Sequence, residues 1–534
     1  MKFQFFQKIC IWPYQKKWNR QKQKGAMTLI SAFLFFAFSS IGLGMLYLSQ
    51  IYLKLGAYKK NTVILEYVSE NGIKKAYNQL SELIRQVPSP KVLSPEKTEE
   101  LKADAKEKGT KTAEELLEVP LPLTCDGIWE NLYWRAQTDF FVKRIEEFED
   151  YFHEYLDVLI QSEGFITNFK QKRSSSLLAV LEVWAGHIPL STIPILIDKS
   201  LSSDQQKGFI EDNDIELSIS SANTLPLGIG FSQEELLPAD PKPLIEKALK
   251  INIFHPQDLS LSLLREALGL EPSDDHVPDG VYLIQDDLGL GGIFVQGDLD
   301  EMVLAIEHGF QIISFLSENG QWQLKFNPSD AETIFISPQG TQHFNLVPRG
   351  IIVVNGEIRS LGGGIVETTG EVTMIMDEEI PCILRGVNLT IISSKKTTIT
   401  SHLIHQGVRW EEGIPYVKDA DSQLHIFAAG QDIQGAQNED GEIVIASDSP
   451  NELKVQTSLT ASGKGISLEG ESKTVNLLGS IQTTDYNSNG NTLKITFDDG
   501  FILDQTRLEN APKSAKPILY VASYGAVEWR ESEL

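Results

Sequence analysis

Two short groups of residues in the C-terminal half have side chains that could do chemistry. His402 and His405 could ligate a metal ion, but residues three apart on a strand face opposite sides and would not share one ion. The run Asp377–Glu379 could supply carboxylates for glycoside cleavage. Such sites need two carboxylates separated across a groove, whereas a consecutive acidic run is typical of an exposed turn. We therefore expect no catalytic, cofactor-binding or metal-binding residues.

Glycine-rich and acidic segments give no stronger sign of an enzyme. Gly362–Gly364 and Gly463–Gly465 lack the helix and the Lys-Ser/Thr pair that follow a phosphate-binding loop. Asp498–Gly500 lacks the alternating acidic ligands of a calcium loop. No Gly-x-Ser-x-Gly or His-Glu-x-x-His motif occurs. The expected function is therefore binding or structural, without a cofactor.

Length and composition limit the class of protein. With 534 residues, 41% hydrophobic residues and a formal net charge of −26, the chain is long enough for two to four domains and too apolar to be wholly disordered. The acidic balance argues against nucleic acid as a partner, because phosphate binding needs clustered Lys and Arg. Three cysteines exclude a disulfide scaffold. Whether Cys125 pairs with Cys382 stays open.

The N-terminus combines a basic segment with a long apolar run. Residues 1–24 carry seven Lys and Arg and no acidic residue, which leaves −33 for the remainder. The 29 residues 25–53 carry no charge, and about 20 apolar residues suffice for a helix to span a bilayer. The sequence predicts a transmembrane segment over 26–53. By the positive-inside rule, the N-terminus is cytoplasmic and the bulk of the chain is extracytoplasmic.

A single helix is expected to continue beyond the membrane to residue 86. No proline occurs between Ala26 and Leu83, and Pro88 and Pro90 then end the helix. Apolar residues recur at roughly helical spacing after Lys54, namely Val63, Tyr67, Ile73, Ala76, Tyr77 and Leu80. Glu70 and Lys74 form a favourable i,i+4 pair on the opposite, polar face.

Residues 20–83 resemble the N-terminus of PilX-type minor pilins of bacterial type IV pili. The matching features are the basic leader ending in Lys24-Gly25, the apolar start Ala26-Met27-Thr28-Leu29-Ile30, and the later segment Glu70-Asn71-Gly72-Ile73 with Ala76 and Leu80. The resemblance implies cleavage by prepilin peptidase between Gly25 and Ala26. It also implies insertion in the bacterial inner membrane, and pilin or pseudopilin subunits as partners in a pilus-like filament.

One position departs from the pattern of major pilins. These carry a Glu five residues into the mature chain, where this sequence has Ile30. PilX-like proteins also lack this Glu, so the departure fits a minor subunit. An uncleaved membrane anchor remains an alternative.

The middle of the chain is expected to be largely helical. Residues 87–128 read as a charged linker, because large apolar residues are few within 94–119. Residues 129–280 are expected to form a helical region. The first helix would cover 129–160, where Trp129, Leu132, Tyr133, Ala136, Phe140 and further apolar residues follow an i, i+3, i+4 pattern.

Residues 281–534 are expected to form a β-rich ectodomain. Glycines number 14 in 1–280 and 26 in 281–534, and short β-branched stretches alternate there with turn residues. The stretches are Gly292–Val295, Gly350–Val354, Val372–Met376, Leu389–Ile392, Thr397–Thr400, Leu424–Ala428, Ile443–Ala446 and Thr474–Leu478. Such spacing allows a sandwich, a barrel or a solenoid, and we expect a solenoid-like core over about 345–500.

A second resemblance covers about 350–531. Gly350-Ile-Ile-Val-Val-Asn-Gly-Glu-Ile, Asn476-Leu-Leu-Gly-Ser-Ile-Gln and Val527-Glu-Trp-Arg-Glu are similar to a bacterial domain of unknown function that is often appended to PilX-type N-termini. This resemblance implies a β-rich, solenoid-like ectodomain without known enzymatic activity.

The expected fold class is therefore α+β, with a transmembrane pilin-like helix, a helical middle and a β-solenoid ectodomain. The expected function is that of a membrane-anchored minor pilin-like protein in type IV pilus-like assembly, surface display or adhesion. Two alternatives stay open: a membrane-anchored β-solenoid enzyme acting on polysaccharide, and a structural envelope protein that is never processed.

Overall fold

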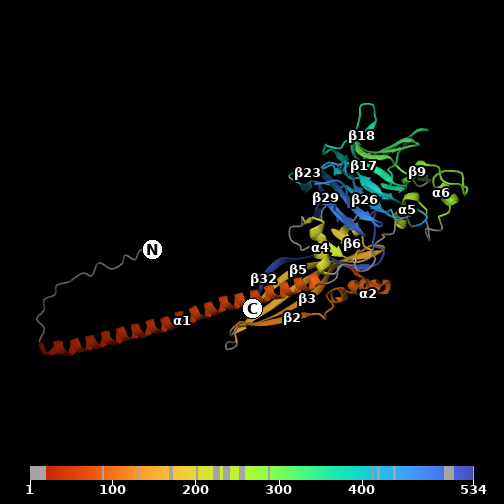
Figure 1. Ribbon diagram of the computed structural model, residues 1–534. Helices are drawn as coiled ribbons and strands as arrows, with labels where there is room; N and C mark the ends of the chain where they lie inside the picture. The colour runs from red at the N-terminus through yellow and green to blue at the C-terminus, as the bar shows by residue number, and fades with distance from the viewer. Residues whose placement is uncertain are drawn as a thin grey trace.

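The computed structural model describes residues 20–86, 90–129, 132–166, 172–199, 203–219, 229–231, 241–251, 259–286, 289–411, 413–417, 421–436, 440–497 and 510–532. The leader residues 1–19, with Cys10, lie outside the described residues. The protein is mostly β, with 48% of the structure in strands. The long helix α1 (Arg20–Gln86) extends away from the rest of the molecule over its first half (Figure 1).

The second half of α1 lies along a six-stranded antiparallel sheet with the order β1-β32-β5-β4-β3-β2. These strands are β1 (Lys91–Val92), β2 (Leu123–Trp129), β3 (Leu132–Glu147), β4 (Tyr151–Ile166), β5 (Lys172–Gly186) and β32 (Ile518–Ser532). Two short helices, α2 (Pro95–Lys106) and α3 (Lys111–Leu117), share one hydrophobic core with α1 and this sheet. We call this unit the helix-bearing sheet.

The prediction of a helical middle region is wrong. The described residues of 129–160 lie in β2, β3, β4 and the turn between β3 and β4, and residues Ser174–Trp184 lie in β5. Burial alternates along the central part of these strands: Leu156, Val158 and Ile160 of β4 are buried, and so are Ala136 and Phe140 of β3. Aromatic residues also occupy the other face of the sheet, where Phe141 is 53% exposed. Combining residues of both faces produced a false helical periodicity.

The expected charged linker contains α2 and α3, whose small apolar stripe is buried. Leu101 and Ala105 of α2 and Leu116 of α3 are almost inaccessible to solvent. Four further short helices follow among the described residues, and all of them fall within the expected helical region 129–280. They are η1 (Leu190–Thr192), α4 (Ser203–Asp212), α5 (Lys242–Leu249) and α6 (Leu261–Ala267).

Two large sheets make up the body between β5 and β32, and the chain passes from one to the other repeatedly. The first contains β6 (Ile195–Ile197), β7 (Ile215–Ile219), β8 (Ile229–Phe231), β9 (Gly280–Asp286), β10 (Gly289–Gln296), β16 (Ile351–Asn355), β20 (Asn388–Ser393), β25 (Gln423–Ala428), β27 (Glu452–Ala461), β29 (Thr474–Thr483) and β31 (Thr492–Phe497). The second contains β11 (Glu301–Glu307), β12 (Phe310–Ser317), β13 (Gly320–Asn327), β14 (Glu332–Ser337), β15 (Gly340–Phe344), β17 (Ile358–Val366), β18 (Val372–Met374), β21 (Thr397–Ile399), β26 (Glu442–Ile445), β28 (Gly465–Leu468) and β30 (Tyr486–Asn487).

Parallel pairing dominates the first sheet from β10 to β7, and parallel pairs also join β11, β17, β21, β26, β28 and β30 in the second. Register places similar residues side by side, as in the buried row Ile352, Ile391, Ile426, Leu459 and Ile481. These residues share one core with the inward residues of the second sheet. Two small pairs complete the body, β19 (Pro381–Ile383) with β22 (Ile404–His405), and β23 (Val408–Glu411) with β24 (Ile414–Val417).

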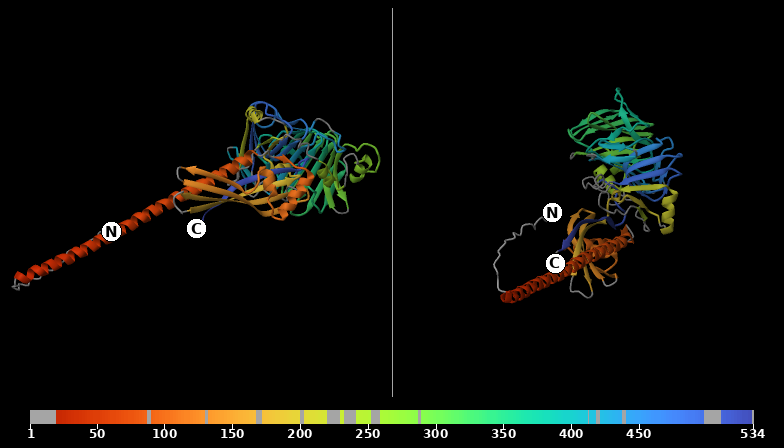
Figure 2. Two further views of the ribbon diagram at one scale, coloured as in Figure 1. Left: turned by 90° about the horizontal axis from the view of Figure 1, so that it is seen from below. Right: turned by 90° about the vertical axis from the view of Figure 1, so that its left-hand side faces the viewer.

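The body is an insertion in the helix-bearing sheet. The chain leaves this sheet after Gly186 and returns at Ile518, and the two residues are register partners. A second core joins the parts, because Tyr151 and Trp184 of the sheet pack in one cluster with Phe427 of the body. Figure 2 shows the body at one end of the sheet, with the free half of α1 pointing away from it. Residues 518–532, expected in the β-rich ectodomain, thus lie in the sheet that carries α1.

Candidate functional site: the N-terminal helix and its docking surface

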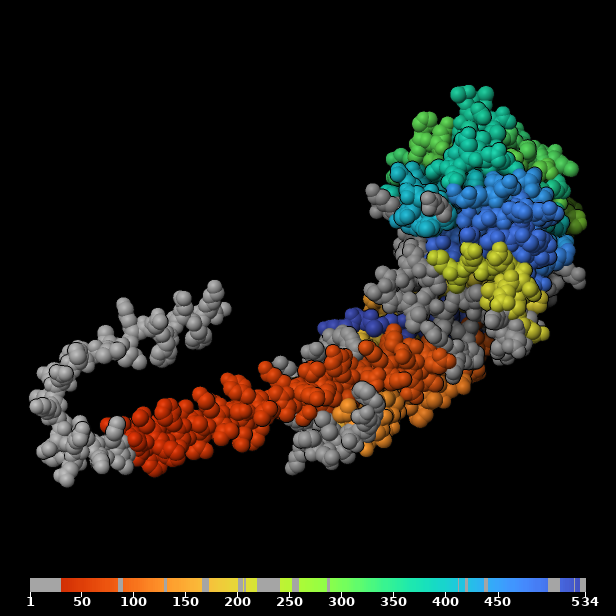
Figure 3. All heavy atoms as spheres, turned by 60° about the vertical axis from the view of Figure 1, so that its left-hand side comes forward, coloured from red at the N-terminus to blue at the C-terminus, as the bar shows by residue number. Residues whose placement is uncertain are grey.

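The free half of α1 presents apolar side chains on every side. It is the helix that is long and apolar enough to span a membrane, with a mean hydropathy of 1.8 over its best 18-residue window, none of which is buried. Figure 3 shows this half as a rod without contacts to the body. Its exposed large hydrophobic residues include Ile30, Phe33, Phe35, Phe36, Phe38, Leu43, Met45, Leu46, Tyr52 and Leu53. An all-round apolar surface of this length is unfavourable in water and favourable in lipid.

The expected processing site lies near the start of this helix. Gly25 and Ala26 fall within α1, and their side chains lie outside the described residues. Ile30, at the position of the pilin Glu, is 59% exposed on the free half. Ile30 thus lies on the free half of α1, well before Leu65, the first residue that docks on the sheet.

The docked half begins near Leu65 and uses a narrow face of α1. Its buried side chains are Leu65, Val68, Ser69, Ile73, Ala76, Leu80, Ser81 and Ile84. Of the apolar residues expected on this face, Ile73, Ala76 and Leu80 are buried, whereas Val63 and Tyr67 are exposed. The prediction of one continuous helix is confirmed. The expected core face is wrong at Val63 and Tyr67, because the buried face is rotated toward Leu65 and Val68.

Two glycines allow the helix to approach the strands closely. A Cβ atom on Gly72 would lie 2.1 Å from Ser162 Oγ and 3.0 Å from the Trp134 ring. On β4, a Cβ atom on Gly164 would lie 2.7 Å from the Leu65 carbonyl oxygen. Between these points, Ser69 Oγ and Ser175 Oγ share a hydrogen bond of 2.7 Å. The close contact explains why glycine occupies position 72 in the sequence motif.

Glu70, the first residue of that motif, is half-buried beside Gly72. The contacts of the described residues include no ion pair between Glu70 and Lys74, so the expected i,i+4 pair stays a prediction. Ile73, the last motif residue, is fully buried against the sheet. The motif thus lies within the docked half of α1, one to two turns after its first buried residue, Leu65.

Beneath α3, the docking surface contains a buried carboxyl group that sequence reasoning missed. Glu154 of β4 is inaccessible to solvent, and neither of its carboxyl oxygens has a hydrogen-bond partner among the described residues. Burial raises the pKa of Glu154 to about 7; the nearby Thr112 hydroxyl opposes this shift and the charge of Asp104 adds to it. The alternation of β4 would have identified Glu154 as inward, had the segment been assigned as a strand.

A second buried titratable group lies on the opposite face of β4. His153 stacks on Trp184 with ring centroids 4.4 Å apart, and its two ring nitrogens have no partner among the described residues. Burial lowers the pKa of His153 to about 3, and the charge of Arg144 adds to the effect. This imidazole is neutral at physiological pH and sits where the sheet meets the body.

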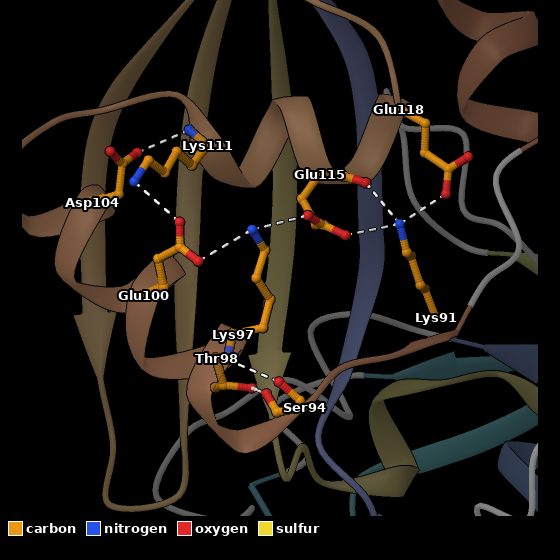
Figure 4. A network of polar contacts seen from close by, with 9 residues as sticks. All are labelled: Lys91, Ser94, Lys97, Thr98, Glu100, Asp104, Lys111, Glu115 and Glu118. Carbon is orange, nitrogen blue, oxygen red and sulfur yellow. Dashed lines mark hydrogen bonds and ion pairs between the residues drawn. The ribbon is translucent and has the colours of Figure 1, made fainter.

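A network of ion pairs fixes α2 and α3 at the edge of the sheet (Figure 4). Lys91 Nζ of β1 lies 3.0 Å from Glu115 Oε1 and 2.8 Å from Glu118 Oε1. The two glutamates lie at the C-terminal end of α3. Lys97 bridges Glu115 and Glu100, and Lys111 bonds Glu100 in turn. The hydrogen bond from Lys91 lowers the pKa of the Glu115 carboxyl. At the start of α2, Ser94 accepts a hydrogen bond from the Lys97 N–H and so caps the helix.

The residues that suggested catalysis do not form a recognisable catalytic group. Asp377–Glu379 lie exposed in a bend, and Glu379 pairs with Lys454. His402 Nδ1 accepts a hydrogen bond from the Lys454 N–H. His405 bonds Ser422 Oγ and the Gln456 carbonyl instead. Within the described part of the chain, no three His, Cys, Asp or Glu residues are placed to hold a metal ion, and Cys125 and Cys382 are free.

Comparison of the chain with protein-family models, with curated proteins and with solved structures gives no match.

Proposed function

We propose that this protein is a membrane-anchored, minor pilin-like subunit with a large extracytoplasmic β-rich domain. Its role is assembly, surface display or adhesion in a type IV pilus-like system of the bacterial envelope. The observation that carries this proposal is the division of α1. One uninterrupted helix has a free apolar half and a second half docked on an antiparallel sheet.

This division fits a subunit that lies in the membrane before assembly and among other helices afterwards. The free half would exchange lipid for the apolar helices of neighbouring subunits, which needs no bond chemistry. Gly42 and Gly44 have open space around them in the isolated chain, and small residues allow helices in a membrane to approach closely. The docked half would hold the sheet and the body at a fixed angle to the filament.

Charge distribution supports the proposed orientation. The seven cations before residue 25 would remain cytoplasmic, and the strongly acidic remainder would be translocated. Cleavage between Gly25 and Ala26 would then remove the basic leader and release the helix for assembly. Other pilin or pseudopilin subunits and prepilin peptidase are the partners that this proposal requires.

We also propose that the body is a β-solenoid. Its chain alternates between the two sheets, as in the order β20, β21, β25, β26, β27, β28, β29, β30 and β31, and consecutive visits to each sheet pair in parallel. Each alternation would be one coil of the solenoid. The antiparallel strands β12 to β15 would be an excursion from one coil.

The topology can be tested with full-length fusions at Leu534. Alkaline phosphatase, which is active only outside the cytoplasm, should be active in this fusion, and a fluorescent protein that folds only in the cytoplasm should be dark. A matched variant with the seven Lys and Arg of residues 1–24 replaced by Gln should lose the fixed orientation. A dark phosphatase fusion together with a bright fluorescent fusion would contradict the proposal.

A further inference from the structure

A pocket of about 700 Å³ lies where the β23–β24 hairpin covers the outer face of the first body sheet. Strands β27, β29, β31 and β7 form its floor, and Gly413, Ile414 and Pro415 of the hairpin form its roof. No residue of α1 is among those that line this pocket. Neither membrane anchoring nor the role of the helix-bearing sheet accounts for it.

Register brings four polar residues into one row on the outer face of the sheet. Lys454, Asn476, Lys494 and Glu216 are consecutive partners on β27, β29, β31 and β7, and all but Lys454 line the pocket. Since neighbouring strands lie about 4.8 Å apart, the three lining residues span about 10 Å, roughly the length of two sugar rings. Lys494 Nζ lies 3.1 Å from Glu216 Oε2, and Lys454 pairs with Glu379. The two cations are thus both neutralised by carboxylates.

The centre of the row is an amide that lacks a partner. Asn476 is only 2% exposed, and its Nδ2 has no hydrogen-bond partner among the described residues. Buried donors are nearly always bonded, so an unpaired one lining a pocket indicates a missing acceptor. The roof approaches this amide closely at Gly413, where an added Cβ atom would lie 3.2 Å from Asn476 Oδ1. Gly413 also has a positive φ of +78°, which favours glycine.

The remaining lining has the chemistry of a neutral polar ligand. Thr474, Thr496 and Ser218 add hydroxyl groups, Glu452 adds an acceptor, and Ile414 and Pro415 add an apolar surface. Sugar hydroxyls both donate and accept hydrogen bonds, so they can satisfy an amide, a lysine and a carboxylate together. The carboxylates Glu216 and Glu452 disfavour an anionic ligand in the same place.

We propose that this pocket binds a neutral oligosaccharide, with Asn476 Nδ2 donating to a sugar hydroxyl at its centre. Lys494 and Glu216 contact neighbouring hydroxyls, and Ile414 and Pro415 pack on the apolar face of a pyranose ring. This site is a binding site and includes no covalent step. It does not depend on processing or filament assembly, so its test is separate from that of the proposed function.

Binding can be measured with the full-length protein in a detergent without sugar headgroups, because a glycosidic detergent would occupy the site. The probes are neutral tetrasaccharides of glucose and of N-acetylglucosamine, with tetragalacturonate as the anionic comparison. We expect at least one neutral tetrasaccharide to bind by calorimetry, and tetragalacturonate to bind at least tenfold more weakly or not at all.

Two variants locate the site. Asn476→Leu removes the central donor and should weaken binding at least tenfold. Ser218→Trp adds bulk at an exposed position of the rim and should block the pocket without disturbing the core. The control Thr398→Val lies in a different groove, on the second sheet, and should bind like the wild type. The proposal is overturned if neither neutral tetrasaccharide binds, if the anionic probe binds more tightly, or if folded Ser218→Trp binds unchanged.

Discussion

Gly72 of α1 lies directly against Ser162 of β4, with no room for a side chain between helix and sheet: a Cβ atom at position 72 would come within 2.1 Å of Ser162 Oγ. Ser162 is itself fully buried. This contact is the closest approach that the two docking glycines make between helix and sheet. A single added methyl group at position 72 should therefore destabilise the packing of the helix on the sheet.

We expect Gly72→Ala to destabilise the helix-bearing sheet by about 1–2 kcal/mol. Overpacking costs roughly 1–3 kcal/mol, and the higher helix propensity of Ala returns up to about 1 kcal/mol. Fluorescence of Trp134, whose ring lies 3.0 Å from the added Cβ position, can follow thermal unfolding of the protein in detergent.

Gly56→Ala is the matched control for this substitution. Gly56 lies in the same helix with nothing within 4 Å of its Cβ position, so Ala should leave stability unchanged or slightly raised. Adding Ser162→Ala to Gly72→Ala removes the closest clash and should recover part of the loss. Equal melting temperatures for Gly72→Ala and Gly56→Ala would refute the docking described above.

Glu154 should make the protein less stable as the pH rises from about 4.5 to about 7. Its pKa is raised to about 7 in the folded protein, whereas an unfolded Glu titrates near about 4.3. The folded state therefore binds the extra proton over this range, and stability falls as this proton is lost. Replacement with Gln keeps the size of the side chain and removes the ionisation.

The stability difference between Glu154→Gln and wild type should widen by on the order of 3 kcal/mol in favour of the variant between pH 4 and pH 8. Denaturant titrations at a series of pH values measure this difference. Glu99→Gln, at an exposed position of α2, serves as the control and should follow the wild-type profile. A constant difference across the pH range would show that Glu154 is not buried as described.

Asp377→Asn should leave the protein unchanged. The residue is exposed in a bend, and surface substitutions of this kind shift stability by no more than about 0.5 kcal/mol. Neither wild type nor variant should release reducing sugars from neutral or acidic polysaccharides. Reproducible cleavage by the wild type that is lost in Asp377→Asn would favour the alternative of a polysaccharide enzyme.

The parts of the fold that depend on local sequence were predictable. The charge-free run 25–53 predicted the apolar helix, and all eight β-branched stretches coincide largely with strands, as Leu389–Ile392 does with β20. The middle region failed because long twisted strands with aromatic residues on both faces mimic a helical pattern. Alternation at Leu156, Val158 and Ile160 was the better signal.

Contacts between distant segments were not predictable from a single sequence. The pairing of Ile518 with Gly186 joins residues more than 300 positions apart, and no local sequence feature predicts this pairing. Likewise, Lys454, Asn476 and Lys494 lie side by side only because β27, β29 and β31 pair in parallel and in register. The sequence motif drew attention to Gly72. Only the structure shows why a glycine is needed there, because Ser162 leaves no room for a side chain.

The central claim, that the chain is a pilin-like subunit, is tested most directly by the N-terminal sequence of the mature protein. The protein should be isolated from a bacterial host with an active prepilin peptidase, together with a Gly25→Val variant. The account predicts that the wild type begins at Ala26 and that the variant, whose branched side chain blocks cleavage, retains Met1. A wild-type protein that still begins at Met1 in that host would contradict it and leave an unprocessed membrane anchor.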